Sequence, residues 1–366
     1  MKKKPKATAF IIAGIVIVSM IFTGVYFREQ IFNSLTKDTL AEQPTISQIE
    51  KVKSFTKDCL QESLDDGTYE IGLKGGHLTI PAGDFPPTAY NPMTNSLNIF
   101  GSEGLSIPYW SFLTPNNLEK TQIPSKQEME TELSNFVESE VVSCLNDYTL
   151  FKSEGYNIEF TAPKVAIEIG NEAVIADVEM TLNINYKESS QTFSKFKTIS
   201  NVPLGKLYAR SLELFEYEAR TGFVENFTIE TMVVYDEIPF SGVDFECTPR
   251  TWLKSQVVQD LKSILALNIP TLKIEGTDFV IKDRKDEQLI HEVFKKNEKD
   301  LTVSLMSSPS WPLMVDVIGT DSEILRGKPF TSENEAARFL LPLFCLNDYH
   351  FVYDLKFPVL ATLTED

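Results

Sequence analysis

The sequence predicts an α+β protein in which an N-terminal transmembrane helix is followed by antiparallel sheets packed against amphipathic helices. Three observations support this fold class. Residues 7–27 form an uncharged apolar run, and four later segments carry apolar residues at helical spacing. Between the second and third of these segments, apolar and polar residues alternate over residues 176–186. Such alternation is typical of a half-exposed antiparallel strand.

The apolar run is long enough to cross a membrane. Its 21 residues form a helix of roughly 32 Å, which matches a hydrocarbon core of roughly 30 Å. Lysines precede the run at positions 2, 3, 4 and 6, and this bias places residues 1–6 in the cytoplasm as a basic tail. A cleaved signal peptide is the alternative, although the run exceeds the usual apolar region of about 7–15 residues. Both interpretations export the rest of the chain.

The exported part is acidic. The chain of 366 residues has a formal net charge of −18, and without the four tail lysines the remainder carries about −22. This charge argues against nucleic acid and anionic lipid headgroups as partners of the outer chain, so the bilayer around residues 7–27 is the lipid contact we expect. Hydrophobic residues make up 42% and aromatic residues 11% of the chain, which favours a folded protein over a disordered stalk.

Four cysteines lie in the exported part: Cys59, Cys144, Cys247 and Cys345. An even number in an exported domain indicates disulfides, and four cysteines allow three pairings. We favour Cys59–Cys144 with Cys247–Cys345, because each bond then ties segments within one half of the outer chain. The spacings are unlike those of zinc ligands. Four buried free thiols are the alternative, since cysteine is among the most buried residue types.

The first half of the outer chain predicts a helix, a loop-rich segment and a second helix. After a spacer at residues 28–46, a helix begins at Ser47, whose spacing to Glu50 is that of a capping box, and ends at Asp65-Asp66-Gly67. In residues 68–124 we expect short strands and long loops, with a tight turn at Gly75-Gly76 leading into a strand. A second capping box, Ser125 with Glu128, opens a helix whose apolar face includes Met129, Leu133, Phe136, Val137, Val141, Cys144, Leu145 and Tyr148.

A β-meander and a third helix follow. The strand at 176–186 is preceded by apolar alternation at 165–169 across a Gly170-Asn171 turn, and we expect another strand at 192–199. The third helix has an inner face formed by Leu204, Leu207, Tyr208, Leu212 and Phe215.

The last third predicts one more helix and several strands. Thr248 suits the N-cap and Pro249 the first helical position. We expect strands at 271–281, 301–306 and 313–318 and a final long strand over residues 349–359 and the residues after it. The outer chain then divides into two α+β domains, residues 47–235 and 236–366. The pentapeptide Cys-Leu-Asn-Asp-Tyr occurs at 144–148 and again at 345–349, which raises the hypothesis of an internal duplication.

Several short motifs resemble a group of uncharacterised archaeal single-pass envelope proteins. They are Cys59-Leu60, Gly75-Gly76-His77-Leu78, Ile107-Pro108-Tyr109-Trp110, Asp244-Phe245-Glu246-Cys247 and the run from His350 to Val359. The resemblance implies an extracytoplasmic location and supplies no activity. In similar proteins we expect further sequence after the strand that follows Pro358, so a truncated reading frame, and with it a degraded product, is a further expectation.

The sequence carries no enzyme motif above the level expected by chance; its two Ser-x-x-Lys matches, at 34–37 and 54–57, are expected in a chain with this many serines and lysines. There is no Gly-x-Ser-x-Gly, P-loop, dinucleotide-binding glycine motif, HExxH or EF-hand loop, so we predict no catalytic residues, cofactor or metal. Tyr109, Trp110 and Phe112 form an aromatic cluster in the loop-rich segment and are candidates for a binding surface; covering the core is the alternative. Asn226-Phe227-Thr228 is a glycosylation sequon.

These observations favour a membrane-anchored extracytoplasmic protein with a role in binding or in envelope assembly, with envelope proteins as partners. The alternative is an envelope hydrolase whose site is assembled from residues distant in sequence. A deep cleft that holds His77 or His350 beside a carboxylate or a serine would favour the hydrolase. A flat or aromatic surface would favour binding.

Overall fold

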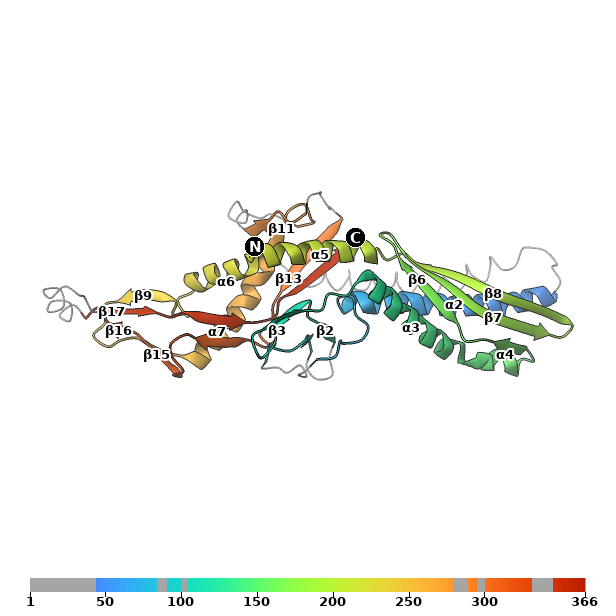
Figure 1. Cartoon of the computed structure of the whole chain (residues 1–366), viewed down its shortest axis with the longest axis horizontal. Helices are drawn as coiled ribbons and strands as arrows, with labels where there is room; N and C mark the ends of the chain where they lie inside the picture. The colour runs from blue at the N-terminus through green and yellow to red at the C-terminus, as the bar shows by residue number, and fades with distance from the viewer. Residues whose placement is uncertain are drawn as a thin grey trace, which may run out of the picture.

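The fold was examined in a computed structural model, which describes residues 44–83, 91–100, 105–279, 289–294, 300–330 and 345–365. The basic tail, the apolar run at 7–27 and most of the spacer lie outside these ranges. Within them, no helix combines the length and the apolar character needed to cross a membrane. The molecule is elongated, with its N-terminal half at one end and its C-terminal half at the other (Figure 1). It is a mixed α+β structure built from helices and mainly antiparallel sheets, as predicted.

The N-terminal half is a sheet covered on one face by two helices. Helices α2 (Pro44–Leu73) and α3 (Lys126–Leu145) pack on strands β5 (Asn157–Phe160), β6 (Lys164–Ile169), β7 (Val174–Tyr186) and β8 (Ser189–Ser200). The long strand β7 pairs with β8 along one edge and with β5 and β6 along the other, all antiparallel. Its apolar residues are buried beneath the helices while Asp177 and Glu179 point outward, so the predicted strands and their alternation are confirmed.

Helix α2 is longer than predicted at both ends: it begins at Pro44 and not at Ser47, so the first predicted capping box does not open it, and Asp65-Asp66-Gly67 does not end it. Leu64, Thr68 and Ile71 are all fully buried and continue its apolar face through this site. Gly67 is the point of closest approach to α3: a Cβ atom there would lie 2.7 Å from Cδ1 of Phe136. The glycine therefore serves helix packing and not helix termination. The second capping box is confirmed, since Ser125 accepts from the backbone of Glu128 and the Glu128 carboxylate accepts from the backbone of Ser125.

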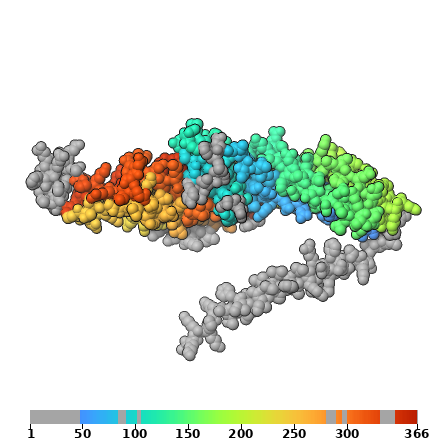
Figure 2. All heavy atoms as spheres, turned by 90° about the horizontal axis from the view of Figure 1, so that it is seen from below, coloured from blue at the N-terminus to red at the C-terminus, as the bar shows by residue number. Residues whose placement is uncertain are grey.

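The segment between α2 and α3 folds into two hairpins. Strands β1 (Ser96–Asn98) and β2 (Ser106–Pro108) form one, and β3 (Ser111–Leu113) and β4 (Glu119–Thr121) form the other. The turn at Gly75-Gly76 is present, but the strand expected directly after it is not, because residues 77–80 pair with no other strand. Figure 2 shows this region, in cyan, at the middle of the length of the molecule.

Two helices run end to end along one long edge of the molecule (Figure 1). Helix α5 (Leu204–Thr221) was predicted, and α6 (Phe223–Val234), which follows a left-handed Gly222, was not. Helix α5 is shared between the two halves, since Leu204 and Tyr208 pack in the N-terminal core whereas Leu207 and Leu214 pack in the C-terminal one. Helix α6 packs entirely with the C-terminal half. The packing therefore changes from one half to the other within α5, and the domain boundary at residue 235 stays a prediction.

The C-terminal half is built around α7 (Lys254–Asn268) and short strand pairs. Its strands are β9 (Ser241–Asp244), β10 (Thr251–Leu253), β11 (Lys273–Ile274), β12 (Ile290–His291), β13 (Leu301–Met306), β14 (Met314–Val317), β15 (Ile324–Arg326), β16 (Lys328–Pro329), β17 (Asn347–His350), β18 (Tyr353–Lys356) and β19 (Leu360–Glu365). The described pairs are β10–β15, β13–β19, β14–β18, β16–β17–β9 and the parallel pair β11–β12. Strands 301–306 and 313–318 are confirmed. The predicted strand 271–281 is reduced to Lys273–Ile274, because a 3-10 helix ends at Thr271 and a turn follows Ile274; residues 280–281 lie outside the described residues.

Two predictions for this half are wrong. Helix α7 begins at Lys254 and not after Thr248, because residues 251–253 pair with β15 and the cap comes from a distant segment. The Glu323 carboxylate accepts from the Ser255 backbone N–H at 2.9 Å. The predicted final long strand is three short strands, β17, β18 and β19, each in a different sheet.

Both predicted disulfides are present. Cys59 on α2 is bonded to Cys144 on α3 with 5.7 Å between their Cα atoms, and Cys247 is bonded to Cys345 with 4.4 Å. The two Cys-Leu-Asn-Asp-Tyr copies have different structures. In the first copy Asn146, Asp147 and Tyr148 are left-handed, whereas the second leads into strand β17. The structure therefore gives no support to a duplication.

Candidate binding surface at the β3–β4 hairpin

Trp110 belongs to the packing of the molecule rather than to an open surface. Its indole N–H donates to the carbonyl oxygen of Gly75 at 2.8 Å. The ring meets Tyr208 and Phe215 of α5 edge-on, with centroid distances of 6.1 and 5.9 Å. Trp110 thus joins the end of α2 to α5, and for this residue the structure favours the core-covering alternative.

Tyr109 is also turned inward. Its backbone N–H donates to the carbonyl oxygen of Asn95 at 3.0 Å. The phenolic oxygen is buried and has no hydrogen-bond partner among the described residues, and burial raises the pKa of the Tyr109 hydroxyl well above its ordinary value. A neutral, shielded hydroxyl cannot serve as a surface contact, so Tyr109 does not contribute to an open binding face.

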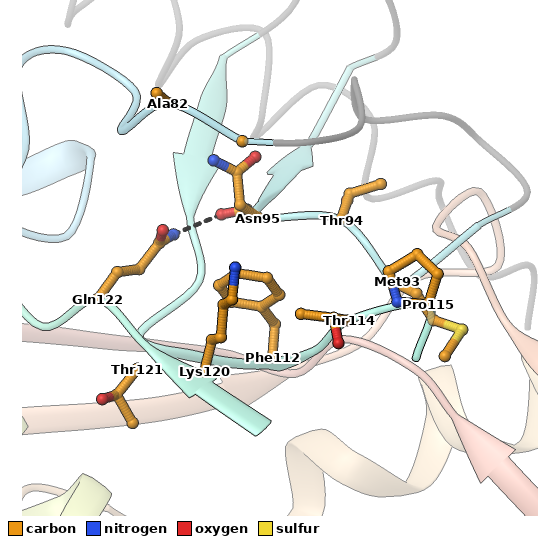
Figure 3. A pocket seen from close by; sticks show the side chains of 11 residues that line it. Ala82, Met93, Thr94, Asn95, Phe112, Thr114, Pro115, Lys120, Thr121 and Gln122 are labelled. Carbon is orange, nitrogen blue, oxygen red and sulfur yellow. Dashed lines mark hydrogen bonds between the residues drawn. The ribbon is translucent and has the colours of Figure 1, made fainter. Parts of the chain in front are cut away.

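Phe112 lines a small pocket beside the β3–β4 hairpin (Figure 3). The pocket is lined by Ala82, Gly83, Met93, Thr94, Asn95, Phe112, Thr114, Pro115, Lys120, Thr121 and Gln122. Its wall is held by hydrogen bonds: the Gln122 amide donates to the Asn95 carbonyl oxygen at 2.5 Å, and the Asn95 amide donates to the Pro81 carbonyl oxygen at 2.6 Å. These bonds connect the hairpin to the segment that follows α2 and make the pocket pre-formed.

The size and chemistry of the pocket limit what it can hold. Its volume is about 110 Å³, well below the roughly 300–1,000 Å³ of pockets for small-molecule ligands. One wall is the Phe112 ring, and Thr114, Asn95 and Lys120 supply polar groups. A volume of this size fits one side chain of a partner protein better than a metabolite.

Two exposed leucines lie on the same hairpin, but Leu113 follows Phe112 directly on β3 and so points to the opposite face from the pocket. Leu113, at the end of β3, is 36% exposed, and Leu118, just before β4, is 62% exposed. The turn between them is ordered, because the Thr114 backbone N–H donates to the Leu118 carbonyl oxygen at 2.9 Å and the Leu118 N–H donates to the Thr114 hydroxyl at 3.1 Å. We call Phe112 and Leu118 the hairpin surface. The two leucines were missed in the sequence, where isolated leucines carry no signal of exposure.

His77 is held in place by structural contacts. Its Nε2 lies 3.0 Å from the Gln122 carbonyl oxygen, and its Nδ1 lies 3.8 Å from the Glu132 carboxylate. The other oxygen of Glu132 accepts from the backbone N–H groups of Leu78 and Thr79 at 2.6 and 3.1 Å. The imidazole is only 7% exposed. This histidine and carboxylate therefore fasten the turn after α2 onto α3, and they do not line the pocket beside the hairpin.

The other two histidines lie in the C-terminal half. His350 is exposed on β17, with its ring 6.2 Å from that of Phe240. His291 packs against Phe223 at 4.5 Å, and burial lowers its pKa. Within the described ranges, no group of three or more His, Cys, Asp or Glu side chains is arranged to hold a metal ion.

Comparison of the chain with protein-family models, curated proteins and solved structures finds no match.

Proposed function

We propose that this chain is a single-pass membrane protein whose acidic outer part binds other envelope proteins through the hairpin surface. Residues 7–27 form the anchor, residues 1–6 lie in the cytoplasm and the folded part lies outside. This topology follows from the length and charge flanks of the apolar run. It is also what the resemblance to archaeal single-pass envelope proteins implies.

The observation that carries the location is the pair of disulfides. All four cysteines of the chain are bonded, and each bond joins segments at least 85 residues apart in sequence. Disulfides of this kind form and persist in oxidising compartments and are rare in the cytosol of mesophiles. They therefore support export of the folded part.

The hairpin surface supports a binding role. It combines a pre-formed pocket of about 110 Å³ with the exposed Leu118 on a turn that hydrogen bonds keep in one conformation. Interfaces draw most of their binding energy from a few apolar anchors near a well-packed pocket. A rigid surface loses little conformational entropy on binding, which favours affinity.

The test is cross-linking of the full chain in its native membranes without reducing agent, read by mass spectrometry. We expect recurrent envelope proteins linked to residues near the β3–β4 hairpin. Leu118→Glu places a charge on the hairpin surface and should remove these links. Leu150→Glu is the matched control, because Leu150 is 76% exposed on α4 (Thr149–Ser153), within the N-terminal half.

Three results separate the parts of the proposal. Equal loss of links in both variants would point to a general effect of added charge and would contradict a specific surface. Unchanged links in both would move the interface elsewhere. Links only to cytoplasmic proteins would contradict the topology itself.

A further inference from the structure

Helix α6 carries an apolar stripe on its outer side. Ile229 is 51% exposed and Val233 is 59% exposed, and Val234 beside them is 76% exposed. The inner side of the helix is occupied by Phe223, Val224, Thr228, Thr231 and Met232, which are buried against the C-terminal half. The stripe is therefore not the packing face of α6, and its three apolar side chains are exposed to solvent.

The sequon asparagine lies on the same stripe. Asn226 is exposed, and Ile229 and Val233 follow it by three and seven positions. Residues at such intervals share one helix face, and about 1.5 Å of rise per residue puts the two side chains within two turns of Asn226. Asn226-Phe227-Thr228 is the single Asn-x-Ser/Thr sequon with x other than proline in the whole sequence.

The local contacts allow a modified asparagine. The Asn226 side-chain amide donates to the Thr221 carbonyl oxygen at 3.2 Å. Since a primary amide carries two N–H groups, substitution of one leaves the other for this bond. Thr228 is 4% exposed and its hydroxyl donates to the Val224 carbonyl oxygen at 2.8 Å. In the folded chain the sequon threonine is therefore buried while the asparagine is exposed, so modification that requires access to Thr228 would have to precede the folding of α6.

We propose that Asn226 carries an N-linked glycan whose first sugars lie along α6 over Ile229 and Val233. This inference rests on the exported location proposed above. The co-substrate is a lipid-phosphate-linked oligosaccharide. The Asn226 amide nitrogen forms a bond to the anomeric carbon, the bond from that carbon to the lipid-phosphate oxygen breaks, the lipid phosphate leaves and the amide gives up one proton. No oxidation or reduction is involved.

The experiment expresses the full chain in a eukaryotic secretory pathway, which glycosylates Asn-x-Ser/Thr. Three forms are compared by peptide mass spectrometry before and after N-glycosidase treatment: wild type, Asn226→Gln and Lys187→Asn. The last variant is a positive control, since it creates a sequon with Ser189 in an exposed turn. Residue 187 there has a φ of 54°, which asparagine tolerates well. We expect a glycan on the wild-type peptide and its loss in Asn226→Gln.

A second measurement tests coverage of the stripe. Hydroxyl-radical labelling of Ile229 and Val233 should be largely lost in the glycosylated chain and restored after N-glycosidase treatment. Leu253, which is 54% exposed on β10, should label equally in both samples. Equal labelling of the stripe with and without the glycan would overturn its proposed placement.

The outcomes also separate this inference from the proposed function. An unmodified Asn226, with residue 187 of the control variant modified and both disulfides formed, would overturn the glycan and leave the exported location standing. Four free cysteines and no glycan at either site would count against export and against the inference that rests on it.

Discussion

The Cys59–Cys144 disulfide should be the largest single covalent contribution to the stability of the N-terminal half. It joins α2 to α3 across 85 residues of sequence. The chain-entropy relation for a loop of that length gives about 15 cal/mol/K of lost unfolded-state entropy, or about 4.6 kcal/mol at 25 °C. Because Cys59 is 2% exposed within the core, alanine is the better replacement, since serine would add a buried hydroxyl.

The assay is native-state hydrogen exchange of α2 and α3 peptides in the variant with both Cys59→Ala and Cys144→Ala. The free energy of opening for the slowest α2 amides should fall by about 4 kcal/mol. This is somewhat below the entropic value, because measured stabilisation by disulfides is usually smaller than the chain-entropy relation predicts. Wild type with its disulfides reduced should fall by a similar amount, which separates loss of the bond from loss of sulfur packing. A fall below about 1 kcal/mol in both samples would refute the entropic argument.

Three further predictions concern stability. Gly67→Ala should destabilise the chain by about 1–3 kcal/mol in urea unfolding, because the added Cβ would lie 2.7 Å from the Phe136 ring. Gly72→Ala on the same helix should stabilise the chain by about 0.5–1 kcal/mol, because the Cβ added there meets no atom within 4 Å. Equal effects of the two substitutions would contradict the packing role of Gly67. Tyr148→Phe should cost about 1 kcal/mol by removing the 2.8 Å bond to the Thr56 hydroxyl, while Tyr109→Phe should be neutral or stabilising, and a large loss in Tyr109→Phe would reveal a partner for that hydroxyl. Burial, followed by the hydrogen bond with Glu225 and the charge of Glu225, raises the pKa of Glu218 to about 8. The contribution of Glu218 to folding stability is therefore fully present below the unfolded-state carboxyl pKa of 4.5 and is lost as pH rises through about 8. In thermal unfolding from pH 5 to 9, Glu218→Gln should lose less stability than wild type, and parallel pH profiles would exclude this assignment.

Local sequence patterns predicted much of the N-terminal half. The alternation in β7, the capping box at Ser125 and the helical spacing that follows it all depend on neighbours within a few residues. For the strand, the capping box and the helix, the signal and its structural cause are close together in the sequence. The Cys59–Cys144 pairing joins residues 85 apart and was predicted from the even number of cysteines and the division of the outer chain into two halves.

The failures depend on contacts between distant segments. Gly67 was predicted to end α2, because its role becomes visible only when α3 packs against it. The start of α7 was misplaced, because its cap is Glu323, which lies 68 residues away. The final segment was predicted as one strand, although β17, β18 and β19 take three different partners.

The candidate site was predicted in part. Phe112 lines the pocket, as expected of a surface residue, but Tyr109 and Trp110 turn inward. Tyr109 and Trp110 precede β3 and are placed by contacts with distant residues, the Asn95 and Gly75 carbonyl oxygens and helix α5, which the sequence does not reveal. Leu118 lies in the turn that the Thr114 hydrogen bonds close.

The central claim is that the folded part lies in an oxidising compartment outside the cytoplasm. The most direct measurement is thiol trapping. Native membranes are quenched in acid with a thiol-alkylating reagent, and the masses of the intact chain and of its peptides are then measured by mass spectrometry without reduction. The account predicts no alkylated cysteine and two linked peptide pairs, Cys59 with Cys144 and Cys247 with Cys345. Four alkylated cysteines would contradict the exported location and, with it, the proposed function.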